Sequence, residues 1–150
     1  MDVKPYQNSD RAACLAVFES LTPAFIGSAA RSYFEQWLDK SEGAYFVLEH
    51  EESIVGCGGY LLSVDRTGAV LRWGMIRSDS RNLGLGRYLL MYRIREIGKE
   101  GTVDTVVADV PHPSVSFYEK QGFRVHEAPI DGFTPGGDWR RVVKRLTVCV

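Results

Sequence analysis

Residues 81–86 join an arginine to two closely spaced glycines in the order Arg-Asn-Leu-Gly-Leu-Gly. Helical periodicity begins near Arg87, so this loop stands at the start of a helix. The first turn of a helix has backbone N–H groups without intrahelical partners, and the helix dipole adds partial positive charge there. Gly84 and Gly86 carry no Cβ atom, so a bulky anion can approach the backbone. The loop therefore predicts a pyrophosphate site, with Arg81 and Arg87 at its rim.

Two common nucleotide-binding motifs do not fit this loop. No Gly-Lys-Ser/Thr triplet follows it, as a P-loop for ATP would require. The dinucleotide fingerprint fails as well, because Leu89 stands where its third glycine or alanine belongs and the chain lacks a long run of βαβ units. A domain that binds NAD or ATP is therefore disfavoured.

A second motif follows in residues 116–123, Ser-Phe-Tyr-Glu-Lys-Gln-Gly-Phe, which are typical of a short aromatic-rich helix stopped by Gly122. Together the two motifs resemble the GNAT acetyltransferase superfamily, whose loop has the pattern Arg/Gln-x-x-Gly-x-Gly/Ala and whose second signature is an aromatic helix ending in Gly-Phe. Ile76 stands where that family has the apolar end of its fourth strand, and the spacing between the signatures also fits. The resemblance covers roughly residues 44–148 and is looser for the N-terminal helices.

The resemblance implies a site for acetyl-CoA. The end of the fourth strand would offer backbone groups to the pantetheine arm and the acetyl carbonyl, and the loop would hold the pyrophosphate through main-chain N–H groups. The residues in these two roles are Gly74, Met75 and Ile76 on the strand, and Arg81, Asn82, Leu83, Gly84, Leu85, Gly86 and Arg87 at the loop. Tyr118 stands at the family's general-acid position, where a tyrosine protonates the departing CoA thiolate. A phenol suits this role because its ordinary pKa of about 10 keeps it protonated at neutral pH.

The implied reaction is direct transfer, in which an unprotonated amine attacks the thioester carbonyl and CoA leaves. Such an amine must first lose a proton to a base or to water. The family's common base positions hold Val70 and Val106 here, and Pro111 replaces an asparagine often found seven residues before the tyrosine. The alternatives that remain are ordered water or one of three side chains at strand ends, Asp109, His112 and Glu49.

Three further features bear on the acceptor. Alternation along a strand would put Arg72 on the same face as Gly74, where it would bind an anionic acceptor group or form a surface salt bridge. Cys57 has no apparent histidine partner, which favours a small buried residue over a nucleophile. The turn-rich loop 131–137 often borders the acceptor site in the resembled family, and we expect it to select the substrate.

Hydrophobic periodicity predicts the elements that position these residues. The expected strands are residues 3–6, 44–49, 53–64, 69–76, 103–110, 123–126 and 141–148. The expected helices lie between the capping residues 8–10 and Thr22-Pro23, from about 28 to 40, over 87–99, and from Pro113 to 120. Strands with helices between them predict an α/β fold. The resemblance implies its GNAT-like form, a mixed and mostly antiparallel central sheet flanked by helices, splayed between the fourth and fifth strands, with CoA in the gap.

Length and composition exclude several classes of protein. A chain of 150 residues fits one domain, 1–150. Its 18 Lys and Arg against 19 Asp and Glu give a formal charge of -1, which disfavours nucleic-acid and membrane-surface binders. Three scattered cysteines form no metal-binding pattern, so no metal is expected and a reduced cytoplasmic setting is the simpler interpretation. The sequence shows neither a signal peptide nor an apolar run near the ~20 residues that span a bilayer.

The sequence therefore predicts an acetyl-CoA-dependent N-acyltransferase that acts on a primary amine of a small-molecule or peptide substrate. The absent carboxylates at positions 70 and 106 leave a second hypothesis, a CoA-binding sensor or regulatory module that has lost catalysis. The acceptor, the use of acyl groups other than acetyl, and the oligomeric state are not fixed by the sequence, although the resembled family often forms homodimers.

Overall fold

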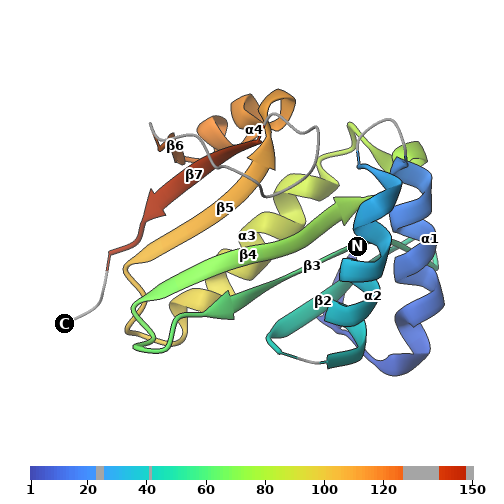
Figure 1. Cartoon of the computed structure of the whole chain (residues 1–150), viewed down its shortest axis with the longest axis horizontal. Helices are drawn as coiled ribbons and strands as arrows, with labels where there is room; N and C mark the ends of the chain where they lie inside the picture. Colours follow the sequence, from blue (N-terminus) through green and yellow to red (C-terminus); the bar gives the residue numbers. More distant parts are fainter. Residues whose placement is uncertain (23–25, 41, 127–138, 148–150) are drawn as a thin grey trace. The chain divides into compact units, whose positions relative to one another are not determined.

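The computed structural model describes residues 1–22, 26–40, 42–126 and 139–147. Figure 1 shows the strands and helices that these residues form. The strands are β1 (Asp2–Pro5), β2 (Ala44–His50), β3 (Ser53–Leu62), β4 (Gly68–Ile76), β5 (Thr105–Pro111), β6 (Arg124–Val125) and β7 (Trp139–Arg145). The α-helices are α1 (Arg11–Leu21), α2 (Arg31–Lys40), α3 (Leu85–Gly98) and α4 (Val115–Lys120). Short 3₁₀ turns precede the helices or their loops, η1 (Asn8–Asp10), η2 (Ser28–Ala30), η3 (Ser78–Ser80) and η4 (His112–Ser114).

The described strands form one seven-stranded sheet in the order β1-β2-β3-β4-β5-β7-β6. β1 with β2, β2 with β3, β5 with β7 and β6 with β7 pair antiparallel, whereas β4 and β5 pair parallel. The parallel ladder joins Gly68–Val70 to Thr105–Val107, and β4 continues beyond it to Ile76. The predicted order of elements and the predicted mixed, mostly antiparallel sheet with flanking helices are confirmed.

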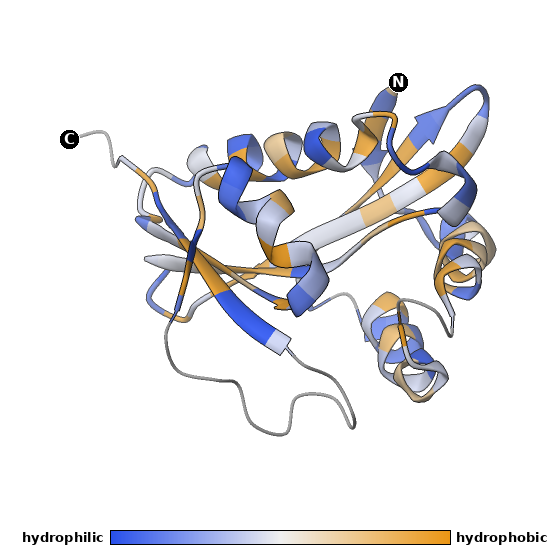
Figure 2. Cartoon of the chain, turned by 90° about the horizontal axis from the view of Figure 1, so that it is seen from above, coloured by the Kyte–Doolittle hydropathy of each residue, from blue (hydrophilic) through white to orange (hydrophobic). Residues whose placement is uncertain are grey.

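The chain divides into two compact units, Met1–Leu61 with Arg72–Arg93, and Leu62–Leu71 with Ile94–Val150. In the first unit, α1 and α2 cover one face of β2 and β3, and α3 covers the opposite face (Figures 1 and 2). The face under α1 and α2 is rich in aromatic side chains, among them Phe18, Phe34, Trp37, Tyr45 and Trp73. The face under α3 is aliphatic, with Leu48, Val55, Ile76, Leu85 and Leu89.

In the second unit, β5 has the alternating burial of a strand with one face in the core. Val106, Ala108 and Val110 are buried, whereas the residues between them are half-buried. α4 contacts β6 and β7. The hairpin that leads into β4 closes between Ser63 and Gly68, where the N–H of Ser63 donates to the carbonyl of Gly68 at 2.9 Å. This turn lies between the two strands that the sequence predicts at 53–64 and 69–76.

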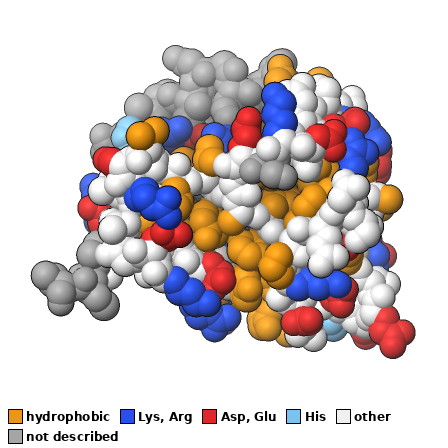
Figure 3. Space-filling model, turned by 90° about the horizontal axis from the view of Figure 1, so that it is seen from below, with side chains coloured by type: hydrophobic (Ala, Val, Ile, Leu, Met, Phe, Trp, Pro, Cys, Tyr) orange, Lys and Arg blue, Asp and Glu red, His pale blue; other side chains and the backbone are white. Residues whose placement is uncertain are grey.

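Charges of both signs are mixed over the surface drawn in Figure 3, where Lys and Arg side chains lie among Asp and Glu side chains. The near-neutral composition leads to the same expectation. Mixed charge gives this face no single-sign field of the kind that attracts a polyanion. Among the described residues, no helix is both long enough and apolar enough to cross a membrane.

Candidate active site

The glycine loop ends in a helix that starts two residues earlier than the sequence predicts. α3 begins at Leu85, because the carbonyl of Gly84 already accepts the N–H of Tyr88 at 3.1 Å. Leu85 is 2% exposed in the aliphatic core, whereas Leu83 is 59% exposed. The loop therefore crosses from solvent to core within two residues, and its last residues belong to the first helical turn.

Two residues of the loop have positive φ angles, which turn the chain from solvent into the core. Asn82 has φ 66° and Gly84 has φ 77°. A Cβ atom built on Gly84 would meet no heavy atom within 4 Å, so the space beside this glycine is open. Gly84 is thus required by its backbone conformation, and the same position leaves room for a bulky group next to the first helical N–H groups.

The segment before the loop is tied to α1. The N–H of Ser78 donates to Oγ of Ser20 at 3.1 Å, and the N–H of Ser80 donates to the carbonyl of Arg77 at 2.9 Å. Arg77 Nε also donates to Oδ1 of Asp79 at 2.6 Å, and this hydrogen bond lowers the pKa of the Asp79 carboxyl. Ser20 is a supporting residue that sequence reasoning missed, because nothing near position 20 indicates a contact 58 residues away.

The end of β4 carries a backbone irregularity. Trp73 has φ 48°, a left-handed value that is rare for a bulky residue. Beyond it, Met75 packs under α1 and α2, while Ile76 packs under α3. Gly74 is exposed, and a Cβ atom there would lie 2.7 Å from an Nη atom of Arg93. The backbone is therefore accessible at Gly74. The side chains of Met75 and Ile76 anchor the next two residues in the cores on the two faces of the sheet.

This irregularity corrects one expectation. Simple alternation put Arg72 on the face of Gly74, but the positive φ at Trp73 interrupts the extended backbone between them. The alternation of side chains along a regular strand therefore cannot be used to place Arg72. Its guanidinium forms no hydrogen bond or ion pair with the residues that the structure describes, so the surface salt bridge considered from the sequence is absent from that part of the chain.

Tyr118 belongs to the second unit, on α4. Its ring is half-buried and meets the rings of Phe117 and Phe123 edge-on, with centroid distances of 5.1 and 5.3 Å. Gly122 has φ 91° and ends the helix, and the N–H of Phe123 donates to the carbonyl of Tyr118 at 3.1 Å. The ring is held by both aromatic neighbours of the second sequence motif, while its hydroxyl forms no hydrogen bond with any described residue.

Two of the three candidate bases are held in ion pairs. Both oxygens of Asp109 accept from Arg141, at 2.9 Å from Nε and 3.1 Å from Nη2, and the Asp109 side chain is 8% exposed. The hydrogen bond to Asp109 raises the pKa of Arg141. Glu49 pairs with Lys4 across β1 and β2. His112 is exposed in η4.

The candidate cysteine is buried, as expected. Cys57 and Cys14 are 0% exposed and both are free thiols. Hydrogen bonding to Cys57, together with burial, raises the pKa of Cys14, so Cys14 does not supply a thiolate near neutral pH. The loop 131–137, which we expect to select the acceptor, lies outside the described residues.

The residues expected to bind the donor, 74–76 and 81–87, all lie in the first unit, whereas Tyr118 lies in the second. A sequence model of the acetyltransferase (GNAT) family matches residues 14–123, which is most of the chain. The chain belongs to the acetyltransferase (GNAT) family. The resemblance inferred from two motifs is thus confirmed, and so is the class of enzyme, an acetyltransferase. Membership in the family implies acyl transfer from acetyl-CoA.

Solved structures share the fold at low sequence identity. An acetyltransferase from Streptococcus agalactiae is 22% identical, with a TM-score of 0.77, and the match covers 97% of this chain and 98% of that one. The ribosomal-protein-S18-alanine N-acetyltransferase from Escherichia coli is 16% identical, with a TM-score of 0.80 and coverage of 99% and 96%. N-acetylglutamate synthase from Neisseria gonorrhoeae, complexed with coenzyme A and N-acetyl-glutamate, is 17% identical, with a TM-score of 0.74 and coverage of 97% and 35%. A comparison with curated proteins found no match.

Proposed function

We propose that this acetyltransferase moves an acetyl group from acetyl-CoA to a primary amine of a small-molecule or peptide acceptor, by direct attack of the amine on the thioester. The observation that carries the proposal is the loop at 81–87. There Gly84 turns the chain at a positive φ, beside open space, at the N-terminus of the 14-residue helix α3. The first helical turn has N–H groups without intrahelical partners, and these groups and the positive end of the helix dipole both favour a pyrophosphate at this place.

The chain's own residues would hold the donor at two places. Main-chain N–H groups of Asn82 to Arg87 bind the pyrophosphate, with the exposed Arg81 and Arg87 side chains near its charge. Backbone groups of Gly74, Met75 and Ile76 hold the pantetheine arm and the acetyl carbonyl. When bound, acetyl-CoA supplies an acyl group activated as a thioester. A fixed strand end suits this role because productive attack needs the carbonyl held in one orientation.

Tyr118 is the general acid of the proposal. Its hydroxyl is free of hydrogen bonds to the described residues, and the edge-on contacts with Phe117 and Phe123 fix the direction of the ring. A positioned hydroxyl with no competing partner can donate its proton to the thiolate as CoA leaves.

The ion pairs narrow the choice of base. Asp109 and Glu49 each hold a cation, and an acceptor amine would have to displace that cation before it could transfer a proton to the carboxylate. His112 is exposed and makes no ion pair with the described residues. We therefore assign the first proton transfer to His112 or to ordered water, and to neither carboxylate.

The kind of acceptor and the compartment are inferred from the structural neighbours and from the cysteines. The Escherichia coli neighbour is named for acetylating alanine of a ribosomal protein, and the Neisseria gonorrhoeae neighbour holds N-acetyl-glutamate, so both names point to amine acceptors. Free thiols at Cys14 and Cys57 favour the cytoplasm. We take residues 1–150 as one catalytic domain, and both a monomer and a homodimer are compatible with the reaction.

A second candidate function is a CoA-binding sensor without catalysis. Val70 and Val106 support it, because these positions often carry the base in the family and Val106 is fully buried. This protein would bind acetyl-CoA and acetylate nothing in a panel of amines. The panel should contain amino acids, polyamines and peptides with a free N-terminus, with CoA release followed by a thiol reagent.

Substitution of Tyr118 by phenylalanine tests the acid role. We expect Tyr118→Phe to lower turnover about 100-fold, because it removes the proton donor for the leaving thiolate. Affinity for acetyl-CoA, measured by calorimetry, should stay unchanged because the ring and its packing remain. Tyr33→Phe is the matched control, since Tyr33 is 67% exposed on α2 and has no proposed role. Turnover equal to that of the wild type would remove Tyr118 from the mechanism.

A further inference from the structure

Trp73 holds a conformation that costs free energy. Its φ of 48° lies in the left-handed region, where a bulky side chain crowds the backbone, and such residues persist only when their surroundings hold them. Trp73 directly precedes the segment Gly74–Ile76, to which the proposed function assigns the acyl group and the pantetheine arm. Whatever holds Trp73 therefore also sets the geometry of that segment.

One side chain contacts the backbone of Trp73 directly. The hydroxyl of Tyr45, on β2, donates to the carbonyl oxygen of Trp73, on β4, at 2.8 Å. β3 lies between these two strands, and Tyr45 pairs with Gly59 on it. A Cβ atom at Gly59 would lie 2.6 Å from Cδ1 of Tyr45 and would also clash with the carbonyl oxygen of Ala44. Gly59 therefore provides the space in which the Tyr45 ring crosses β3.

The Tyr45 ring is itself fixed. It is 8% exposed and contacts Tyr6, Phe34 and Trp37 edge-on, at centroid distances of 5.8, 6.3 and 5.9 Å. The indole of Trp73 lies 5.1 Å from the ring of Phe34, so the same aromatic cluster holds both ends of the hydrogen bond. Burial raises the pKa of the Tyr45 hydroxyl, which keeps it a hydrogen-bond donor at ordinary pH.

We propose that Tyr45 is a positioning residue for the donor site, whose hydroxyl holds the Trp73 carbonyl and thereby fixes the backbone of Gly74–Ile76 for the acyl end of acetyl-CoA. This role rests on the proposed function. The role concerns only one part of the donor site, because Tyr45 contacts the end of the strand and not the pyrophosphate loop at 81–87. The nucleotide end and the acyl end of the donor should therefore respond differently when the hydroxyl is removed.

The chain offers a matched pair of variants for this test. Tyr45→Phe removes the hydrogen bond and keeps the ring. Tyr6→Phe removes a neighbouring hydroxyl that is also buried but has no hydrogen-bond partner among the described residues. Binding by calorimetry should compare acetyl-CoA with adenosine 3′-phosphate 5′-diphosphate, the nucleotide part of CoA without its pantetheine arm.

We expect Tyr45→Phe to weaken acetyl-CoA binding about tenfold, the effect of losing one well-placed hydrogen bond, while nucleotide binding stays unchanged. Tyr6→Phe should match the wild type for both ligands. An equal loss for both ligands in Tyr45→Phe, or no loss for either, would overturn the role of Tyr45. A wild-type protein that binds neither ligand would overturn the proposed function itself, and this role with it.

A measurement on the wild-type protein covers the case in which Tyr45→Phe does not fold. A tyrosine hydroxyl in the core whose oxygen lies 2.8 Å from the Trp73 carbonyl oxygen exchanges its proton slowly with water, so NMR should detect the Tyr45 hydroxyl proton close to the protons of Trp73. A hydroxyl proton in fast exchange with water would contradict the hydrogen bond and so the proposal.

Discussion

At the scale of single residues, Gly84 shows how far one position can be interpreted from sequence. The sequence predicts that the missing side chain of Gly84 lets an anion approach the backbone. The structure adds that its φ of 77° requires glycine and that its missing Cβ would meet no heavy atom within 4 Å. The two requirements coincide, because the turn that creates open space is also the turn that only glycine adopts easily.

Alanine at this position should affect both stability and binding. We expect Gly84→Ala to lower the free energy of unfolding by about 1 kcal/mol, because an L-residue is strained at this φ. Its methyl group should also weaken acetyl-CoA binding by occupying the open space. Gly98→Ala is the control, since Gly98 ends α3 at an ordinary φ with open space around it, and alanine there should be neutral or stabilising. Urea unfolding and calorimetry measure the two effects, and a Gly84→Ala protein as stable as the wild type would contradict the strain.

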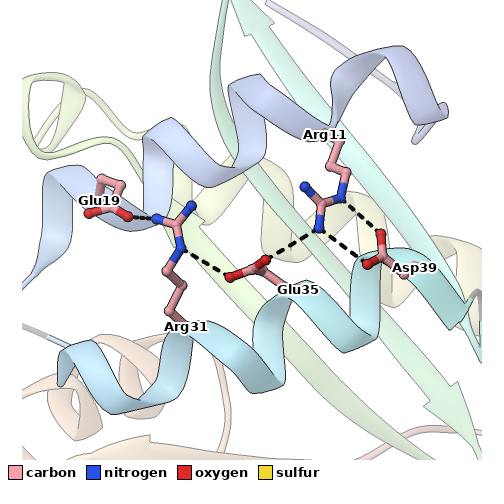
Figure 4. A network of polar contacts seen from close by, with 5 residues as sticks. All are labelled: Arg11, Glu19, Arg31, Glu35 and Asp39. Carbon is pink, nitrogen blue, oxygen red and sulfur yellow. Dashed lines mark hydrogen bonds and ion pairs between the residues drawn. The ribbon is translucent and has the colours of Figure 1, made fainter.

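At the scale of elements, α1 and α2 are joined by a network of ion pairs (Figure 4). Arg11 Nε donates to Oδ1 of Asp39 at 2.8 Å, and its Nη2 reaches Glu35 at 3.4 Å. Arg31 Nε donates to Glu35 at 3.0 Å, and Arg31 also pairs with Glu19. These side chains are 33–54% exposed, so water and salt screen them. The network stabilises the two helices that cover the aromatic core around Tyr45.

This network predicts a pH dependence. The hydrogen bond from Arg11 lowers the pKa of Asp39 in the folded protein. The stabilisation by this ion pair is therefore fully present above the pKa of Asp39 in the unfolded chain, about 4. It is lost as the pH falls through the lower pKa that Asp39 has in the folded protein. The melting temperature of Arg11→Met should fall below that of the wild type at neutral pH, and the difference should shrink toward pH ~3.

Lys40→Met provides the control for charge alone, because Lys40 ends α2 exposed and has no ion pair with the described residues. The difference in melting temperature between Lys40→Met and the wild type should not follow the titration of Asp39. A difference between Arg11→Met and the wild type that stays constant from neutral to acid pH would show that packing of the Arg11 stem, and not the ion pair, accounts for it.

At the scale of the whole molecule, membership in the GNAT family predicts which ligand stabilises the folded chain. A ligand that binds only the folded state at about 100 times its Kd adds about 2.7 kcal/mol of stability. For a chain of this length, that corresponds to a rise in melting temperature of about 5–10 °C. We expect this rise with acetyl-CoA and with CoA, and none with NAD or ATP. Equal rises with NAD or ATP would contradict a site built for CoA.

The sequence by itself determined the features that depend on near neighbours along the chain. Periodicity fixed the order of strands and helices, and the two motifs identified the loop at 81–86 and the helix of Tyr118, because a helix start and a glycine turn are local events. In the structure α3 begins two residues earlier than the sequence predicts, because the N–H of Tyr88 donates to the carbonyl of Gly84.

Only the tertiary structure decided which distant residues support these local features. Tyr45 lies 28 positions from Trp73, Asp109 lies 32 from Arg141, and Ser20 lies 58 from Ser78. Each contact depends on which strands are neighbours, on their register and on where a helix packs, and all three are properties of the whole fold. The positive φ of Trp73 belongs with them, because no local preference favours it and the packed aromatic core must hold it.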